Sequence, residues 1–128
     1  MRVATPPTAA SVSSAASTSA GASGVSGASD PSAPGPVLVY FHGGPEGQER
    51  PSFRSDYQAL VAAGISVLAP NVRGSSGFGK RFVNLDNGAL RKGAVEDIAA
   101  SVDFVVKAGL ADPRRIGITG GSYGGYMT

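Results

Sequence analysis

The segment 116–125 of this chain reads IGITGGSYGG, a short apolar run that leads directly into a glycine-rich turn with one serine. The apolar part predicts a strand, and the turn contains the pattern G-x-S-x-G with Gly120, Ser122 and Gly124 at its fixed positions. A serine on a sharp strand-to-helix turn adopts a strained backbone and projects its hydroxyl above the sheet. Glycines on either side let strand and helix approach closely. The segment therefore predicts a strand, a turn that presents Ser122 as a nucleophile, and a helix.

Two earlier runs are expected to form further strands. Residues 37–41 (VLVYF) and 65–69 (ISVLA) are rich in β-branched and aromatic side chains and are apolar on both alternating faces. Such runs are typical of strands that are buried on both sides in a parallel sheet. Each run ends at a turn signal that contains proline.

Helices are expected between these strands. Residues 57–61 place apolar side chains at helical spacing, behind possible caps at Ser52 and Ser55. Residues 95–106 carry a longer apolar stripe, and the glycine-rich segment 71–88 before it is expected to be a loop. The alternation of strands and helices predicts an α/β fold with a mostly parallel sheet.

The first 36 residues differ in composition from the rest. They contain nine Ser and nine Ala but no aromatic residue, Leu or Ile. Such a segment cannot bury enough apolar area to offset the entropy cost of ordering it. We therefore interpret residues 1–36 as a disordered tail or linker, with an organellar transit peptide as the alternative, and residues 37–128 as the folded part.

Composition excludes several classes of function. The chain has no Cys and one His, which excludes a thiolate metal site and a cysteine nucleophile, and no cofactor is expected. No apolar run approaches the roughly 18 residues of a membrane-spanning helix. The net charge is only +2 and the basic residues are scattered, so nucleic acid is not an expected partner. Because there is no secretory signal either, the cytoplasm is the expected compartment.

The segment 42–45 (His-Gly-Gly-Pro) follows the first expected strand and suggests an oxyanion hole. A serine nucleophile needs two N–H donors for the oxyanion of its tetrahedral intermediate, and losing one costs about 3 kcal/mol. The backbone N–H groups of Gly44 and Tyr123 are the predicted pair, with Gly43 as a supporting residue. A tight turn without function is the alternative.

His42 is the only histidine, but it is not the expected base. In proteins with this kind of serine turn, an acid and then a histidine follow the serine along the chain. We therefore expect the His42 ring to support the backbone of its loop. The sequence ends at Thr128, so acid and base are expected beyond it. Residues 1–128 alone are expected to be inactive, since losing such a unit costs about 10⁶ in turnover.

Other residues receive simpler interpretations. Asp86 is assigned to a cap or loop, and Glu96 and Asp97 are assigned to the solvated face of a helix. For Tyr123, a functional role is assigned to the backbone and not to the ring.

A rival interpretation concerns residues 74–81 (GSSGFGKR), which nearly match the phosphate-binding pattern G-x-x-x-x-G-K-[ST]. Arg81 replaces the hydroxyl residue that would hold Mg²⁺, and the following residues are a poor start for a helix. A nucleotide site at Gly74–Lys80 is therefore the less favoured alternative.

Three stretches, HGGPEGQERP (42–51), APNVRGSSGFGKRF (69–82) and TGGSYGGYMT (119–128), together resemble the prolyl oligopeptidase family, especially its acylaminoacyl-peptidase and dipeptidyl-aminopeptidase branches. The resemblance covers residues 37–128. It implies an α/β-hydrolase catalytic domain, a serine peptidase that cleaves short peptides, and Ser122 as the nucleophile.

The chain departs from this family in two respects. Family members usually carry a β-propeller before the hydrolase domain and the triad Asp and His after the serine, so a partial domain is expected here. Esterases and lipases share the serine turn and commonly have HGGG in the oxyanion loop. Pro45 replaces the last glycine of that form and favours a peptidase. A non-catalytic remnant is the third alternative.

Overall fold

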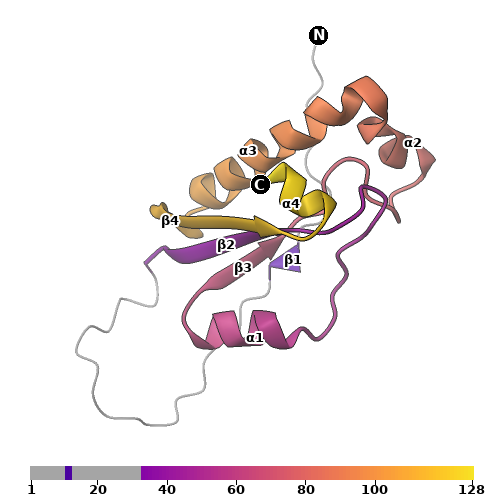
Figure 1. Ribbon diagram of the computed structural model, residues 1–128. Coiled ribbons are helices and arrows are strands. Elements are labelled where there is room, and N and C mark those ends of the chain that lie inside the picture. Colours follow the sequence, from indigo (N-terminus) through magenta and orange to yellow (C-terminus); the bar gives the residue numbers. More distant parts are fainter. Residues whose placement is uncertain (1–10, 13–32) are drawn as a thin grey trace, which may run out of the picture.

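The computed structural model describes residues 11–12 and 33–128, which form a four-stranded sheet with the order β1-β3-β2-β4 (Figure 1). The strands are β1 (Ser11–Val12), β2 (Gly35–Phe41), β3 (Ser66–Ala69) and β4 (Ala111–Gly120). β2 pairs with β3 and with β4 in parallel, whereas β1 pairs with β3 antiparallel. The expected α/β fold with a mostly parallel sheet is confirmed.

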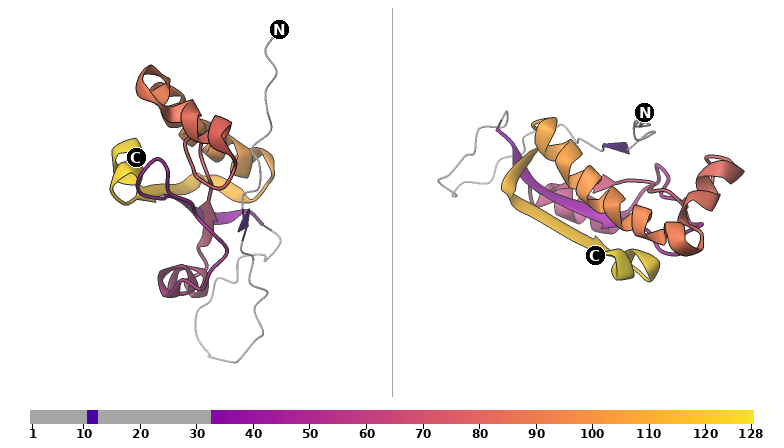
Figure 2. Two further views of the ribbon diagram at one scale, coloured as in Figure 1. Left: turned by 90° about the vertical axis from the view of Figure 1, so that its right-hand side faces the viewer. Right: turned by 90° about the horizontal axis from the view of Figure 1, so that it is seen from above.

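Helices cover both faces of this sheet. The α-helices are α1 (Ser55–Ala62), α2 (Lys80–Val83), α3 (Arg91–Lys107) and α4 (Tyr123–Met127), and the 3₁₀ turns are η1 (Asn84–Asp86) and η2 (Gly88–Leu90). Figure 2 shows α1 on one face and α3 and α4 on the other. The connections β2-α1-β3 and β3-α3-β4 are therefore the crossovers that a parallel sheet requires.

The core lies mainly between the sheet and the helices α3 and α4. The side chains of β2 alternate, with Val37, Val39 and Phe41 buried and the intervening residues half-buried. The buried set is completed from the other elements by Leu68, Val72, Ala94, Val105, Ala111 and Met127. On the opposite face, the rings of Tyr40 and Tyr57 meet edge to face, with centroids 5.7 Å apart, which holds α1 against β2.

The expected boundary between residues 36 and 37 lies two residues too late, because β2 begins at Gly35. The β2–β4 register is irregular between Gly35 and Val37, at Pro36, which has no N–H to donate to the ladder. The two residues of β1 also belong to the expected tail. Residues 1–10 and 13–32 of that tail lie outside the described residues.

Two local predictions were wrong. Neither Ser52 nor Ser55 caps α1, whose N-cap residue is Arg54 without a side-chain cap. The segment 71–88 is not only loop, because it contains α2 and η1. The stripe of α3 is only partly covered, and Val95 remains exposed.

Candidate active site

Ser122 lies between the end of β4 and the start of α4 in a strained backbone conformation. Its φ is 52° and its ψ is −117°, and it is the only non-glycine residue with positive φ in the described part of the chain. Such strain persists only where the surrounding structure enforces it, and it is common at active sites. The Ser122 side chain is exposed. The turn thus has the geometry that presents a serine hydroxyl to a substrate.

Gly120 and Gly124 make this turn possible because backbone from three segments meets there. A Cβ on Gly120 would lie 2.8 Å from the Phe41 carbonyl oxygen, and one on Gly124 would lie 2.8 Å from the His42 carbonyl oxygen. Real Cβ atoms essentially never approach so closely. The end of β2 therefore touches both sides of the serine turn. A Cβ on Gly120 would also clash with the backbone of Gly124, which is the close approach of strand and helix that the sequence pattern suggested.

The His-Gly-Gly-Pro segment lies directly beside the serine turn. A Cβ on Gly43 would be 3.3 Å from the Ser122 Cβ and 3.2 Å from the Gly121 carbonyl oxygen. Gly44 has a φ of 56°, which favours glycine, and its carbonyl accepts a hydrogen bond of 2.8 Å from the Gly47 N–H. The structure therefore brings Gly43 and Ser122 together from segments nearly 80 residues apart.

The two expected oxyanion donors remain available. Among the described residues, no backbone hydrogen bond engages the N–H of Gly44 or that of Tyr123, whereas the next N–H, of Gly124, donates to the Gly121 carbonyl at 2.9 Å. Unengaged N–H groups beside a nucleophile suit a developing negative charge.

The His42 side chain is hydrogen-bonded to Ser75. Its Nε2 lies 2.8 Å from the Ser75 Oγ, and Ser75 in turn donates to the Val72 carbonyl at 2.6 Å. On the other side of the ring, the His42 Nδ1 lies 3.1 Å from the Gly43 carbonyl oxygen, so both ring nitrogens have a partner. His42 is only 8% exposed. The ring thus braces the oxyanion loop against the segment 72–75, through a side chain that the sequence did not indicate.

Two further contacts join these loops. Asn71 and Glu49 form a reciprocal pair, in which the Glu49 N–H donates to the Asn71 side chain at 2.8 Å and the Asn71 amide donates to the Glu49 carbonyl at 2.9 Å. Arg73 donates to Asp97 of α3 with its backbone N–H and, at 3.0 and 2.6 Å, with its guanidinium. These hydrogen bonds to Asp97 raise the pKa of Arg73. Assigning Asp97 to a purely solvated face was therefore wrong.

The geometry of residues 74–80 does not fit a phosphate-binding loop. A Cβ on Gly77 would lie 2.8 Å from the Gln48 amide carbon, so the loop is packed against another segment there. The Asp86 carboxylate lies beside Gly74, where it would repel a phosphate. These glycines serve close packing.

Asp86 is buried, which its assignment to a cap or loop did not predict. It is only 2% exposed, and the Tyr123 hydroxyl donates to its two carboxylate oxygens at 2.8 and 2.9 Å. The Arg91 Nε lies 4.0 Å from Asp86, and the guanidinium carbon lies 5.5 Å from the Tyr123 ring centroid. Burial and the Asp86 hydrogen bond raise the pKa of Tyr123 to about 12. No local pattern around residue 86 signals this contact.

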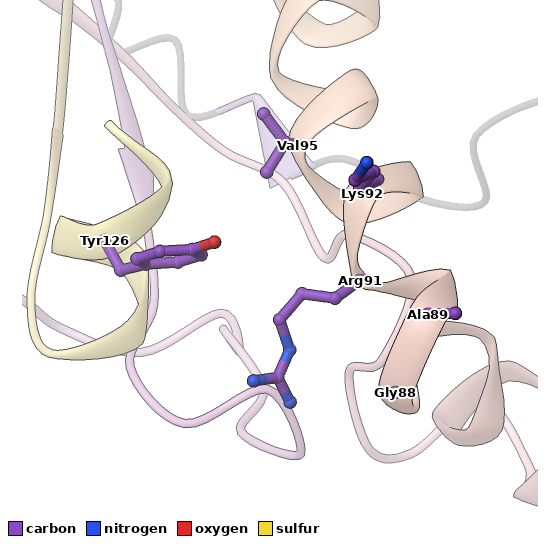
Figure 3. Close-up of a pocket in the computed structure, with 6 residues that line it drawn as sticks. All are labelled: Gly88, Ala89, Arg91, Lys92, Val95 and Tyr126. Atoms are coloured by element: carbon purple, nitrogen blue, oxygen red, sulfur yellow. The ribbon is translucent and has the colours of Figure 1, made fainter.

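A pocket of about 360 Å³ lies between the start of α3 and α4 (Figure 3). It is lined by Gly88, Ala89, Arg91, Lys92, Val95 and Tyr126. Tyr126 is 68% exposed, and its ring stacks on that of Tyr123 with centroids 5.9 Å apart. The pocket adjoins the helix that carries the serine turn, but none of the expected site residues lines it.

Two kinds of feature are absent from residues 11–12 and 33–128. No group of three His, Asp or Glu side chains there is placed to hold a metal ion. No helix there is both long enough and apolar enough to cross a bilayer.

A strained serine turn after a parallel strand, with the His-Gly-Gly-Pro segment at the end of the neighbouring strand, is the arrangement of an α/β-hydrolase domain, and this chain is part of such a domain. The prolyl oligopeptidase family matches residues 51–128, and the chain belongs to that family.

Individual relatives agree with this assignment. The chain is 41% identical over 98 residues to dipeptidyl peptidase family member 6 of Caenorhabditis elegans, a match covering 77% of this chain and 13% of that protein. It is 40% identical over 96 residues to dipeptidyl aminopeptidase BIII of Pseudoxanthomonas mexicana, covering 75% and 14%. The acylaminoacyl peptidase of Pyrococcus horikoshii has a similar structure, with a TM-score of 0.66 and 36% identity over 75% of this chain and 16% of that one. The chain therefore spans about one seventh of the length of these proteins.

Proposed function

We propose that this chain supplies the nucleophile and the oxyanion hole of a serine peptidase that acts on short peptides. The observation that carries the proposal is the strained backbone of Ser122, with Gly43 packed against it and two free N–H groups nearby. A similar acylaminoacyl peptidase, 36% identical with a TM-score of 0.64, is solved in complex with Z-Gly-Gly-Phe-chloromethyl ketone, a peptide-like ligand.

In the proposed reaction, the Ser122 Oγ attacks the carbonyl carbon of the scissile peptide bond and its proton passes to a general base. The oxyanion that forms accepts hydrogen bonds from the Gly44 and Tyr123 N–H groups. The C–N bond then breaks, the amine leaves with a proton from the same base, and water hydrolyses the acyl group from Ser122.

The base is proposed to lie outside the residues that the structure describes. His42 is buried and its ring nitrogens contact Ser75 and the Gly43 carbonyl, so it does not fill that role. In α/β-hydrolases the acid and the histidine follow the serine along the chain. We propose that a segment following Thr128 supplies the acid and the histidine.

Two further proposals concern the surroundings of the protein. We propose that it acts in the cytoplasm, and that neither nucleic acid nor a membrane is a partner.

The test uses the longest natural chain that contains residues 1–128. A fluorophosphonate probe should label it in a way that Ser122→Ala abolishes and that Ser52→Ala, a change at an exposed loop serine, leaves intact. Labelling that persists in Ser122→Ala would refute the assignment of the nucleophile.

A second measurement addresses the type of substrate. The kcat/KM for peptide anilides should exceed the kcat/KM for matched esters of non-peptide acids. The reverse order would identify an esterase, and the absence of both labelling and turnover would favour the non-catalytic alternative.

A further inference from the structure

Asp86 is a buried carboxylate that has no part in the reaction described above. Burying a charged carboxylate is costly unless hydrogen bonds and an opposite charge compensate it. Here the compensation comes from the Tyr123 hydroxyl, which reaches both oxygens, and from Arg91 at 4.0 Å. The energetic cost of burying Asp86 is thus offset mainly by the residue that directly follows the nucleophile.

The surroundings of Asp86 join three segments of the chain. Asp86 ends η1, Arg91 begins α3, and Tyr123 begins α4. Gly74 packs directly against Asp86, because a Cβ there would lie only 2.6 Å from the Asp86 Cβ. The Asp86 side chain is therefore closely packed against Gly74 and gives the Tyr123 hydroxyl a fixed acceptor.

The serine turn needs support on both sides to keep its strained backbone. Strain of this kind costs about 1–3 kcal/mol and is kept only when neighbouring contacts enforce it. On one side, Gly43 and the end of β2 pack against the turn. On the other, the hydrogen bond from the Tyr123 side chain to Asp86 restrains the first residue of α4.

We propose that Asp86 is a positioning residue for the nucleophile turn. Through the Tyr123 hydroxyl it holds the Tyr123 N–H and the Ser122 backbone in the geometry that stabilises the oxyanion. Asp86 itself does not contact substrate. The inference rests on the proposed peptidase function, because positioning matters only if the oxyanion forms at Ser122.

The expected size of the effect follows from the geometry. Removing one oxyanion donor lowers kcat by about 10²–10³, and a misplacement of about 1 Å costs about 10²-fold. Asp86→Ala keeps the Tyr123 N–H but frees it to move, so we expect kcat to fall about 10- to 100-fold. KM should change by less than about threefold, because the loss is confined to the transition state.

The experiment compares variants of the longest natural chain that contains residues 1–128. Tyr123→Phe should reproduce the loss of Asp86→Ala, and the double variant should be no worse than either, because both remove the same contact. Asp86→Asn should recover most of the kcat, since its amide oxygen still accepts from the hydroxyl. Asp103→Asn, which changes an exposed carboxylate of α3, is the matched control and should behave as wild type.

Two kinetic outcomes would overturn the proposal. One is a wild-type kcat in folded Asp86→Ala or Tyr123→Phe, and the other is losses that simply multiply in the double variant. If Asp86→Ala does not fold, Tyr123→Phe decides alone, because it removes a single oxygen.

A spectroscopic titration separates this inference from the peptidase proposal. The alkaline absorbance change of Tyr123, taken as the difference between wild type and Tyr123→Phe, should have a midpoint near pH 12, and Asp86→Ala should lower it. A midpoint that Asp86→Ala leaves unchanged would disprove the contact. A contact proven by titration in a protein that neither reacts with the probe nor cleaves peptides would instead refute the proposed function, and the positioning role with it.

Discussion

Gly124 offers the most direct test of the geometry at the nucleophile turn. Gly124→Ala adds one methyl group at a position where α4 meets the end of β2. The new carbon would lie 2.6 Å from the Phe41 carbonyl carbon, 2.8 Å from the His42 oxygen, and closer still to the Phe41 oxygen. All three atoms are backbone, so no side-chain rotation relieves the clash.

The magnitude follows from what has to move. Phe41 is buried and belongs to the strand at the middle of the parallel sheet, so α4 must shift instead. Overpacking of a core by one methyl group typically costs about 1–3 kcal/mol. Because this clash is with the backbone of two consecutive residues at the end of a buried strand, we expect Gly124→Ala to lose about 3 kcal/mol of unfolding free energy. The same shift displaces Ser122, so probe labelling should slow as well.

Chemical denaturation of the longest natural chain that contains residues 1–128 measures this loss. Gly121→Ala is the matched control, because a Cβ there has its nearest neighbour, the Tyr40 hydroxyl, at 3.9 Å, which is ordinary contact. The control should stay within about 0.5 kcal/mol of wild type. Equal stability of the two variants would refute the reasoning, since it would mean that β2 and α4 do not approach as described.

Two further predictions concern the loops around the site, and a third concerns the first turn of α1. Ser75→Ala leaves the buried His42 Nε2 without its hydrogen-bond partner, so thermal unfolding should show a loss of about 1–3 kcal/mol. Arg73→Ala removes two hydrogen bonds to Asp97 at a partly exposed site, and denaturation should show a loss of about 1–2 kcal/mol. The hydrogen bond from the Arg54 guanidinium lowers the pKa of Asp56 to about 2. The stability that this ionised carboxylate contributes should therefore be lost as pH falls from about 4 to 2. Asp56→Asn should remove that part of the dependence of stability on pH.

Each of these predictions has a control in the same chain. Ser52→Ala changes an exposed serine and should not alter stability, and Lys107→Ala breaks an exposed ion pair within α3 and should cost no more than about 0.5 kcal/mol. A Ser75→Ala variant as stable as its control would contradict the buried bond. An Arg73→Ala loss as small as that of Lys107→Ala would contradict the role of Arg73. Identical acid profiles of wild type and Asp56→Asn would contradict the shifted carboxyl.

The sheet and the serine turn were predictable because their signals are local. An apolar run followed by G-x-S-x-G specifies strand, turn and helix within ten residues, and β2 and β3 have the same kind of signal. The boundaries were less accurate, because the start of β2 depends on pairing with β4 and not on the composition of Gly35 and Pro36. Burial was also less predictable than helix formation. The apolar spacing of α3 indicates a helix, but it does not show which of its apolar side chains are covered, and Val95 is exposed.

Only the backbone geometry of the site was predictable from the sequence. The glycines around Ser122 indicate by themselves that segments of backbone approach each other closely there. The hydrogen bonds of His42 to Ser75 and of Tyr123 to Asp86 join residues 33 and 37 positions apart, and no spacing rule connects them. Asp86 therefore looked like an ordinary loop residue until the fold placed it beside the turn.

The pairing of β2 with β4 has a consequence for how this protein tolerates change. Phe41 and Gly120 are partners in the ladder, and the loops that carry His42 and Ser122 begin directly after them. A slip of one position would displace these loops relative to each other by about 3.3 Å and invert the faces of β4. Insertions within the crossover that carries α3 leave this alignment untouched, whereas a single residue gained or lost inside either strand would separate the two loops of the proposed active site without changing any of its residues.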